Sequence, residues 1–246
     1  MVRPPGVGPV PSTPRAGGLA GALAARLAAD GAQPFVTYYN DATGERTELS
    51  VATLNNWVAK TANLLVDGLG LQPGDTVRLA VPLHWQEVAI RFACLSAGAD
   101  IVDHGPSAVL FWAETGTATG AEPPRDADDV VGVSLQPLRR GLSRTYPGVL
   151  DYDAELPGYA DSFAAPAPEP EQLRLLSAAG TAWPLLPGER VLVTEADPDG
   201  LIELSAVATE RASLVIWPDP EEARLPTRCT AERVTALARG GMLTRL

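Results

Sequence analysis

Histidine is the side chain best suited to acid–base chemistry near neutral pH, and the chain has two of them. His104 stands beside Asp103 in the segment IVDHGP (101–106), after an expected strand, which is where open α/β sheets place ligands. The carboxylate could orient the imidazole, but no nucleophile motif accompanies the pair, so a structural role is favoured. His84, in VPLHWQE (81–87), is predicted to begin a helix and to satisfy backbone groups there.

Three acidic segments have some of the features of a cation site. In EADPDGLIEL (195–204), the residues Asp197, Asp199 and Gly200 match three positions of a calcium loop. The twelfth position, where such a loop needs a bidentate Glu, is Ala206, so we predict a loop that leads into a helix, with Asp199 as a candidate cap. The clusters DADD (126–129) and DYDAE (151–155) could hold Mg²⁺, but solvated loops of this composition are commoner.

No other pattern in the sequence specifies a reaction. The chain lacks G-x-S-x-G, H-E-x-x-H and paired-cysteine motifs, which argues against a hydrolase and against a zinc site. We therefore predict no catalytic residue, no metal ligand and no cofactor, and the sequence assigns no cofactor-binding residue.

The charge of the chain excludes one class of partner. Acidic residues outnumber basic ones by 30 to 19, which gives a net charge of −11 over 246 residues. Nucleic-acid binding is not expected, because the charge opposes phosphate and no basic patch is present. The single lysine is Lys60, in the middle of an expected helix, where its stem is predicted to cover apolar surface.

The location predicted from the sequence is the cytoplasm. Cys94 and Cys229 are isolated from one another, which fits a reducing compartment better than a disulfide framework. No run reaches the roughly 18 apolar residues that a membrane span needs. The first 30 residues contain Arg3 and an Ala-rich stretch, but early prolines and Arg26 favour a frayed tail over 1–15 and then an amphipathic helix with Leu19, Leu23 and Leu27 on one face, rather than an export signal.

Hydrophobic periodicity and turn residues predict an α/β fold in a layered αβα arrangement with a largely parallel sheet. Strands are expected at 34–39, 76–81, 100–102, 108–113, 130–135, 190–195 and 213–217. Helices are expected at 51–65 with Ser50 as the N-cap, and at 84–97, 171–180, 199–209 and 230–239. Four parts follow from this order: a disordered tail (1–15), an N-terminal lobe (16–163), a Pro-rich connector (164–170) and a second lobe packed on the first (171–246).

The order of these parts resembles a known family. The segment RTELSVATLNNWVAKTANLLVDGLGLQPGDTVRLAVPLHWQEVAIRFACLSAGADIV (46–102) resembles the N-terminal region of the AMP-forming adenylating enzymes, the acyl- and aryl-CoA synthetase superfamily. Ser96 stands where these enzymes usually have Lys. The segment 187–221 resembles a later stretch of the same region, and the likeness extends over 34–236. The chain as a whole is similar to short relatives of the AMP-binding enzymes that match their N-terminal region only.

The departures from that family bear directly on activity. The family carries a Thr-, Ser- and Gly-rich phosphate loop with a Lys, which would be expected between residues 163 and 187. AAPAPEPEQLRLLSAAGTAWPLLP (164–187) has no Lys, and SAAGT (177–181) within it is predicted to be a helix end. ETGTATG (114–120) comes too early in the family order and is predicted to be a flexible connection. The sequence ends at Leu246, before the family's adenine motif and C-terminal domain.

The leading hypothesis is a catalytically degenerate homologue of the adenylate-forming enzymes, not an enzyme itself, that acts by binding or assembly. It would form a homo-oligomer or bind a protein partner, without contacting a membrane or nucleic acid, and could take a small-molecule ligand. One alternative is a small-molecule binding protein with an acyl or nucleotide pocket near residues 103–106 and 194–200. Another is an adenylating enzyme completed in trans by a second chain.

Overall fold

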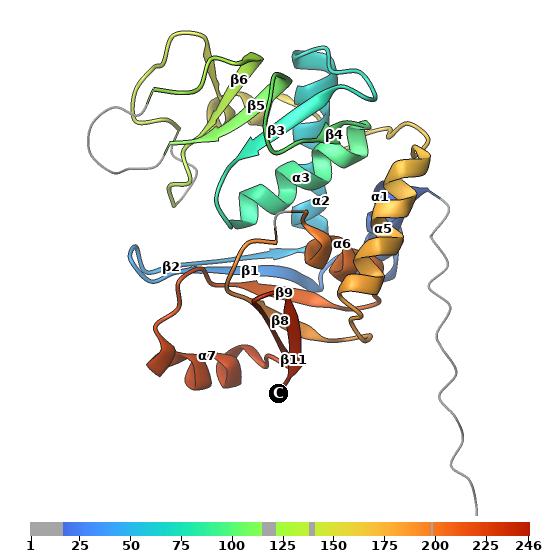
Figure 1. Ribbon diagram of the computed structural model, residues 1–246, viewed down its shortest axis with the longest axis vertical. Helices are drawn as coiled ribbons and strands as arrows, with labels where there is room; N and C mark the ends of the chain where they lie inside the picture. The colour runs from blue at the N-terminus through green and yellow to red at the C-terminus, as the bar shows by residue number, and fades with distance from the viewer. Residues whose placement is uncertain (1–16, 115–121, 138–140, 198) are drawn as a thin grey trace, which may run out of the picture.

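The computed structural model of the protein describes residues 17–114, 122–137, 141–197 and 199–246 (Figure 1). The predicted tail over 1–15 lies outside these residues, and so does nearly all of the segment 114–120. Among the described residues, no helix is both long enough and apolar enough to cross a bilayer.

Five strands form a parallel sheet, which we call the first sheet; it lies in the upper half of Figure 1. Its strand order is β4-β3-β5-β6-β7, and every neighbouring pair runs parallel. The strands are β3 (Thr76–Ala80), β4 (Asp100–Ile101), β5 (Ser107–Ala113), β6 (Ala127–Val133) and β7 (Val149–Asp151). The central strand β5 is almost entirely buried, as its continuous apolar sequence predicts for a parallel sheet.

Six strands form the second sheet, in the lower half of Figure 1, with the order β11-β10-β8-β9-β1-β2. The four inner strands run parallel, and an antiparallel hairpin closes each edge. The strands are β1 (Pro34–Asn40), β2 (Glu45–Ser50), β8 (Arg190–Val193), β9 (Ser213–Ile216), β10 (Ala236–Arg239) and β11 (Met242–Arg245). The sheet therefore joins the beginning of the chain to its end, with Val36 of β1 opposite Leu214 of β9.

Two long helices lie between the sheets (Figure 1), namely α2 (Val51–Asn63) and α3 (Trp85–Ala97). Helix α3 contacts β1 on one side and β3 and β4 on the other, and all of its residues are buried, polar ones included. Its N-cap is His84, whose Nδ1 accepts a hydrogen bond from the Gln86 amide at 3.2 Å. Ser50 caps α2 by accepting from the Thr53 amide at 3.1 Å. Both predicted helix starts are thus confirmed.

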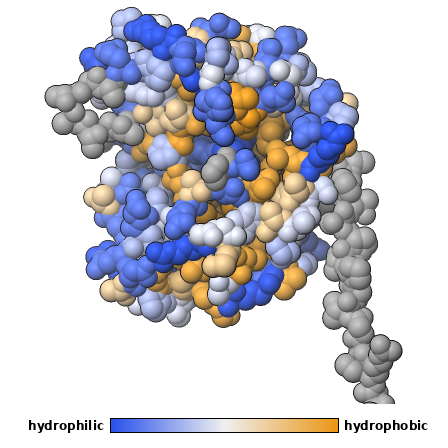
Figure 2. All heavy atoms as spheres, viewed as in Figure 1, coloured by the Kyte–Doolittle hydropathy of each residue, from blue (hydrophilic) through white to orange (hydrophobic). Residues whose placement is uncertain are grey.

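The other helices pack beside this central layer or on the outer faces. α1 (Gly18–Asp30), α5 (Pro170–Ala182) and α6 (Leu201–Ala208) pack on one another. The remaining helical elements are η1 (Leu64–Gly68), α4 (Tyr152–Glu155), η2 (Leu156–Gly158), η3 (Glu222–Arg224) and α7 (Leu225–Glu232). Figure 2, viewed from the same side as Figure 1, shows apolar residues across the middle of this face, with hydrophilic residues above them and at the lower left.

Arg26 of α1 contributes to this packing in a way its sequence position did not predict. It is buried, and its guanidinium donates to the carbonyls of Ala206, Thr209 and Ala212 at 2.8–2.9 Å. The amphipathic helix itself is confirmed, with Leu19 buried, but Leu27 is exposed instead of facing the core. The arginine that interrupts the apolar stretch of the sequence therefore fastens α1 to the end of α6.

The structure confirms the mixed α/β class with largely parallel strands, and it corrects one predicted element. The helix expected at 230–239 is wrong: α7 ends at Glu232, Arg233 takes a left-handed conformation, and 236–239 is strand β10. Gly240 and Gly241, both at positive φ, then form a tight hairpin turn into β11. The paired glycines are the sequence signal that favours this hairpin over a helix.

The division into lobes at residues 164–170 stays a prediction. β1 and β2 precede this connector in the chain, yet they complete the sheet that is otherwise built from residues after it. One continuous core of buried side chains also includes residues from both sides of the connector, from Leu19 to Ala238.

Candidate functional site

A cavity of about 270 Å³ lies between the two sheets, where β3 and β4 end and α6 begins. Its apolar wall comes from Leu79, Val81, Leu83, Ile101, Val102 and Ala196. Its polar lining comes from Glu87, Arg91, Asp103, Asp197 and Glu203. The cavity therefore lies at the carboxyl ends of parallel strands, next to both segments, 103–106 and 194–200, at which a pocket was expected.

Three buried charged groups, which we call the cleft cluster, line one part of this cavity. Glu87 and Arg91 stand one turn apart on α3, and Glu203 stands in the first turn of α6. Both Nε and Nη2 of Arg91 lie 2.7 Å from Oε1 of Glu87. Glu203 is only 1% exposed, and its Oε2 has no hydrogen-bond partner among the described residues. One guanidinium therefore stands near two buried carboxyl groups: it pairs with Glu87, and its charge also acts on Glu203.

This imbalance changes the protonation of the cluster. Burial, followed by the negative charge of Glu87, raises the pKa of Glu203 to about 8, although Arg91 opposes the shift. Burial likewise raises the pKa of Glu87 despite its ion pair with Arg91. At neutral pH, Glu203 is mostly protonated, so the cluster holds a neutral carboxyl group that can donate or release a proton.

The turn before α6 brings Arg91 close to the backbone. Gly200 precedes α6 at a φ of +64°, and a Cβ added there would lie 2.3 Å from Cδ of Arg91. The carboxylate of Asp197 fixes this turn, since it accepts hydrogen bonds from Trp183 Nε1 at 2.8 Å and from the Ile202 amide at 3.1 Å. The sequence from 197 to 203 therefore supplies a glycine, a turn-fixing carboxylate and the buried Glu203 in close succession.

Two further cavities adjoin the first. One, of about 350 Å³, shares Arg91, Ile101 and Asp103 with it and is also lined by carboxylates from other elements, namely Asp100, Glu171 and Asp199. The other, of about 120 Å³, shares Ala196 and Asp197 with it and extends towards Gly240 and Gly241. Carboxylates thus outnumber basic groups throughout this part of the cleft.

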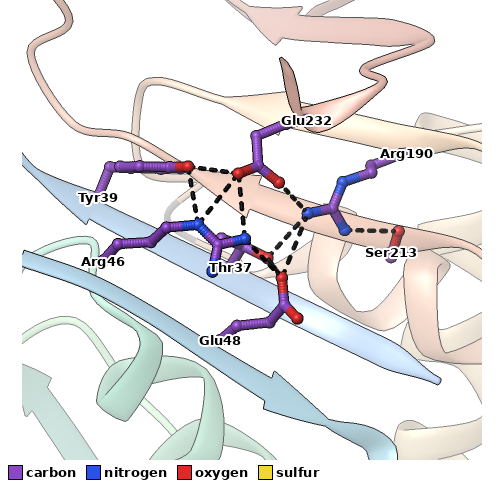
Figure 3. A network of polar contacts seen from close by, with 7 residues as sticks. All are labelled: Thr37, Tyr39, Arg46, Glu48, Arg190, Ser213 and Glu232. Carbon is purple, nitrogen blue, oxygen red and sulfur yellow. Dashed lines mark hydrogen bonds and ion pairs between the residues drawn. The ribbon is translucent and has the colours of Figure 1, made fainter. Parts of the chain in front are cut away.

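A second charged cluster, the outer network, lies where α7 meets the second sheet (Figure 3), and Figure 1 shows α7 on the face of this sheet that points away from α2 and α3. It consists of Thr37, Tyr39, Arg46, Glu48, Arg190, Ser213 and Glu232. Glu232 of α7 pairs with Arg190 at 2.6 Å and with Arg46 at 3.1 Å, and it also accepts a hydrogen bond from the Tyr39 hydroxyl. Arg190 in turn donates to Thr37 at 2.8 Å. The network fastens α7 to the sheet and lines none of the three cavities.

Comparison with known proteins identifies the relatives of the chain. No family model matches it. A protein of Mycobacterium tuberculosis described as a TIGR03089 family protein is 38% identical over 225 residues, which cover 85% of this chain and 93% of that protein. The chain belongs to the TIGR03089 family. An acetyl-coenzyme A synthetase of Coprinopsis cinerea is 41% identical over 64 residues, which are 26% of this chain and 10% of that enzyme.

Solved structures place the fold of this TIGR03089 family protein. It superposes on the N-terminal domain of FACL13 from Mycobacterium tuberculosis with a TM-score of 0.67 at 14% identity, covering 88% of this chain and 61% of that one. Acetoacetyl-CoA synthetase from Streptomyces lividans gives a TM-score of 0.68 at 16% identity, covering 89% of this chain and 42% of that one. The chain thus spans less than two thirds of either protein. The predicted likeness to the N-terminal domains of acyl-CoA synthetases is confirmed at the level of the fold.

In this TIGR03089 family protein, only part of the predicted chemistry reaches the cavity. Asp103 lines it, whereas the exposed His104 beside it is not among the lining residues. His84 is buried as a helix cap, and burial lowers its pKa to about 3, so it stays neutral. The cap of α6 differs from the expected one, because the carboxylate that accepts from the helix is Asp197, not Asp199. Among the described residues, no cluster of His, Cys, Asp or Glu could hold a metal ion.

Lys60 and the segment that stands in place of a phosphate loop also have ordinary structural roles. Lys60 pairs with Asp161 at 2.7 Å and donates to the Tyr159 carbonyl. Residues 177–181 lie inside α5, as predicted, and Ser96 is buried within α3. The five tryptophans are all buried.

The cleft cluster itself was not predicted. Glu87 and Arg91 have the spacing of an exposed helical ion pair, and Glu203 interrupts the apolar run LIELSAVA (201–208). The available signal was the position of these charges on helices that are otherwise apolar, because a charged residue on a buried helix needs a partner.

Proposed function

We propose that this protein is a non-catalytic relative of the adenylate-forming enzymes that binds a small molecule in the cleft between its two sheets. The observation that carries the proposal is the charge of the cleft, where Glu87, Asp103, Asp197 and Glu203 surround the single Arg91. Adenylation builds negative charge on phosphate and needs cations to stabilise it. An acidic cleft disfavours a triphosphate and instead suits a ligand without negative charge.

The segment in place of the phosphate loop supports the same proposal. A phosphate loop binds through backbone amides that are free to donate. In α5, the amides of residues 177–181 belong to a continuous helix, in which each amide donates to the carbonyl four residues earlier. The Thr181 hydroxyl is also occupied, because it donates to the Ser177 carbonyl at 3.0 Å. This segment therefore offers no cradle for phosphate.

A cytoplasmic location is part of this proposal. Cys94 is buried in α3, Cys229 lies on α7, and neither forms a disulfide. Burial raises the pKa of Cys94 to about 12, so this thiol stays protonated and unreactive.

The first experiment tests catalysis. The purified chain is incubated with Mg·ATP and a panel of carboxylic acids, and pyrophosphate is measured, with an active acyl-CoA synthetase as the positive control. We expect no pyrophosphate above the background without protein. Release that depends on any carboxylic acid would contradict the non-catalytic assignment.

The second experiment tests the cleft. Thermal-shift measurements compare AMP, ATP, CoA, fatty acids and aliphatic amines, and a ligand of the folded state raises the melting temperature. Val81→Trp, which fills the cavity from β3, should abolish the shift, whereas Ala42→Trp in the exposed β1–β2 turn should keep it. A shift that survives Val81→Trp would place the ligand elsewhere.

A further inference from the structure

Glu203 lines the cavity of about 270 Å³. One of its carboxyl oxygens, Oε2, is buried and has no hydrogen-bond partner among the described residues. Leaving a buried polar atom unpaired costs about 1–3 kcal/mol, and native structures rarely do so without a reason. Two of the other polar groups that line the cavity already have partners. Two nitrogens of Arg91 serve Glu87, and Asp197 holds Trp183 and the first turn of α6. Glu203 therefore offers a buried acceptor, unpaired among the described residues, to a ligand in this cavity.

The surroundings of Glu203 determine the sign of the charge that fits. Asp103 and Asp197 line the same cavity, and Glu87 already takes up the charge of Arg91. A ligand that carries a positive charge gains from this excess of carboxylates, whereas an anion is repelled. The rest of the wall is aliphatic, with Leu79, Val81 and Ile101 among its residues. The cavity thus combines an acidic end with an apolar wall.

We propose that the cleft binds a small aliphatic amine, whose ammonium group donates to Oε2 of Glu203 and whose carbon chain packs against Leu79, Val81 and Ile101. This inference rests on the proposed function and names the ligand class of the same cleft. A bare divalent cation fits less well, because Ca²⁺ takes six to eight oxygen ligands and no cluster of metal-binding residues exists in the described part of the chain.

Binding of an ammonium group has a consequence for protons. At neutral pH, the proton of Glu203 is mostly in place, because burial and the charge of Glu87 raise its pKa to about 8. The ammonium favours the ionised carboxylate, so the neutral carboxyl group gives up its proton to solvent and the ion pair forms in its place. The charged groups on the elements around Glu203 are Glu87 and Arg91 of α3, Asp103 after β4, Asp197 before α6, Glu171 of α5 and Arg26 of α1. Affinity should therefore increase as the pH rises towards 8.

Isothermal titration calorimetry of the full chain with n-pentylamine tests this inference. Between about pH 6 and pH 8 we expect the dissociation constant to fall by close to tenfold per pH unit. Titrations in phosphate and in Tris, which differ in ionisation enthalpy, should show the release of close to one proton per amine at pH 7. 1-Pentanol and pentanoate have the same chain without the positive charge, and we expect them to bind at least tenfold more weakly. Equal or tighter binding of pentanoate would overturn the inference.

Two variants separate this site from non-specific binding. Glu203→Gln keeps the shape of the side chain but cannot form the ion pair, so it should weaken pentylamine binding at least tenfold at pH 8 and remove its pH dependence. Glu210→Gln, an exposed position after α6, is the matched control and should bind like the unaltered chain. Unchanged binding by Glu203→Gln would overturn the inference.

Circular dichroism verifies that both variants fold, and Val81→Trp, which keeps Glu203, should also prevent binding. The two proposals fail separately. Pyrophosphate release contradicts the non-catalytic assignment, whereas binding of a neutral ligand in the cleft in place of the amine contradicts only the amine proposal.

Discussion

The cleft cluster and the outer network are both built from glutamate and arginine, yet they differ in how completely each charge is paired. In the outer network, Glu232 accepts from Arg46, Arg190 and Tyr39, so every part of its carboxylate is engaged (Figure 3). In the cleft cluster, Glu87 accepts from two nitrogens of Arg91, and Oε2 of Glu203 has no partner in the part of the chain that the structure describes. The outer network holds a helix in place, whereas the cleft cluster leaves an acceptor beside a cavity.

The two clusters also shift pKa values in opposite directions. Burial raises the pKa of both Glu203 and Glu232, but in Glu232 the hydrogen bonds from Tyr39 and Arg190 and the charge of Arg46 outweigh it, and the net pKa is lowered. A lowered carboxyl pKa means that the ionised group stabilises the folded state. A raised carboxyl pKa means that ionisation of the group destabilises the folded state. Complete pairing therefore distinguishes a structural network from a candidate binding site in this molecule.

Arg91→Met should have the largest effect on stability. It leaves the carboxylate of Glu87 buried without its ion-pair partner, and breaking a buried ion pair in this way costs about 3–5 kcal/mol. Urea-induced unfolding near neutral pH measures the change. Arg46→Met in the outer network is the control, and it should cost about 1 kcal/mol or less because its side chain is 45% exposed and Arg190 still pairs with Glu232. Equal losses would remove the distinction between the clusters.

Glu203→Gln should change how stability depends on pH. The folded-state pKa of Glu203 is raised from 4.5 to about 8, so its contribution is fully present below 4.5 and is lost as the pH rises to 8. Glutamine carries no such penalty. The variant should lie close to the unaltered chain near pH 5 and exceed its free energy of unfolding by about 4 kcal/mol near pH 9. A difference that does not vary with pH would contradict the raised pKa.

Gly200→Ala tests the approach of α6 to Arg91. A Cβ at this position would collide with Cδ of Arg91, and the φ of +64° is unfavourable for alanine, so we expect a loss of about 2 kcal/mol. Gly188→Ala is the matched control, because Gly188 also has a positive φ (+80°) but a Cβ there would meet no atom within 4 Å. Gly188→Ala should lose only the free energy that alanine costs at a positive φ, about 1 kcal/mol. Similar losses in chemical denaturation would show that Arg91 moves aside freely.

Most elements of the fold were predictable, because each depends on local signals. Apolar runs between turn residues identified β5 and β9. Ser50 marks the start of α2, and Gly98 marks the end of α3. The end of the chain was predicted wrongly as a helix, because VTALAR (234–239) has no turn residue of its own. The signal for a hairpin is the glycine pair beyond it, Gly240 and Gly241.

The candidate site depended on contacts that the sequence does not contain. Glu87 and Arg91 are four residues apart, which is typical of a solvated pair, and they are buried because α3 is packed between the first sheet and the second sheet. That sheet in turn needs β1 to pair with β9 from the far end of the chain. The segments 103–106 and 194–200 were predictable as pocket walls, since they follow parallel strands, but the charge between them was not.

Glu232→Gln should show the smallest effect, with the opposite pH dependence to Glu203→Gln. The folded-state pKa of Glu232 is lowered, so its contribution is present above the ordinary value of 4.5 and is lost as the pH falls through the folded value. The variant should lose about 1 kcal/mol near pH 7 and almost nothing near pH 3.

Urea-induced unfolding at both pH values gives the comparison. Glu221→Gln is the control, because this exposed carboxylate pairs with Arg224 three residues away on the surface, and it should lose less than half as much. An equal loss by Glu232→Gln at both pH values would mean that the network stabilises α7 through packing and neutral hydrogen bonds. In that case, the contrast with the cleft cluster would depend on the free oxygen of Glu203 alone.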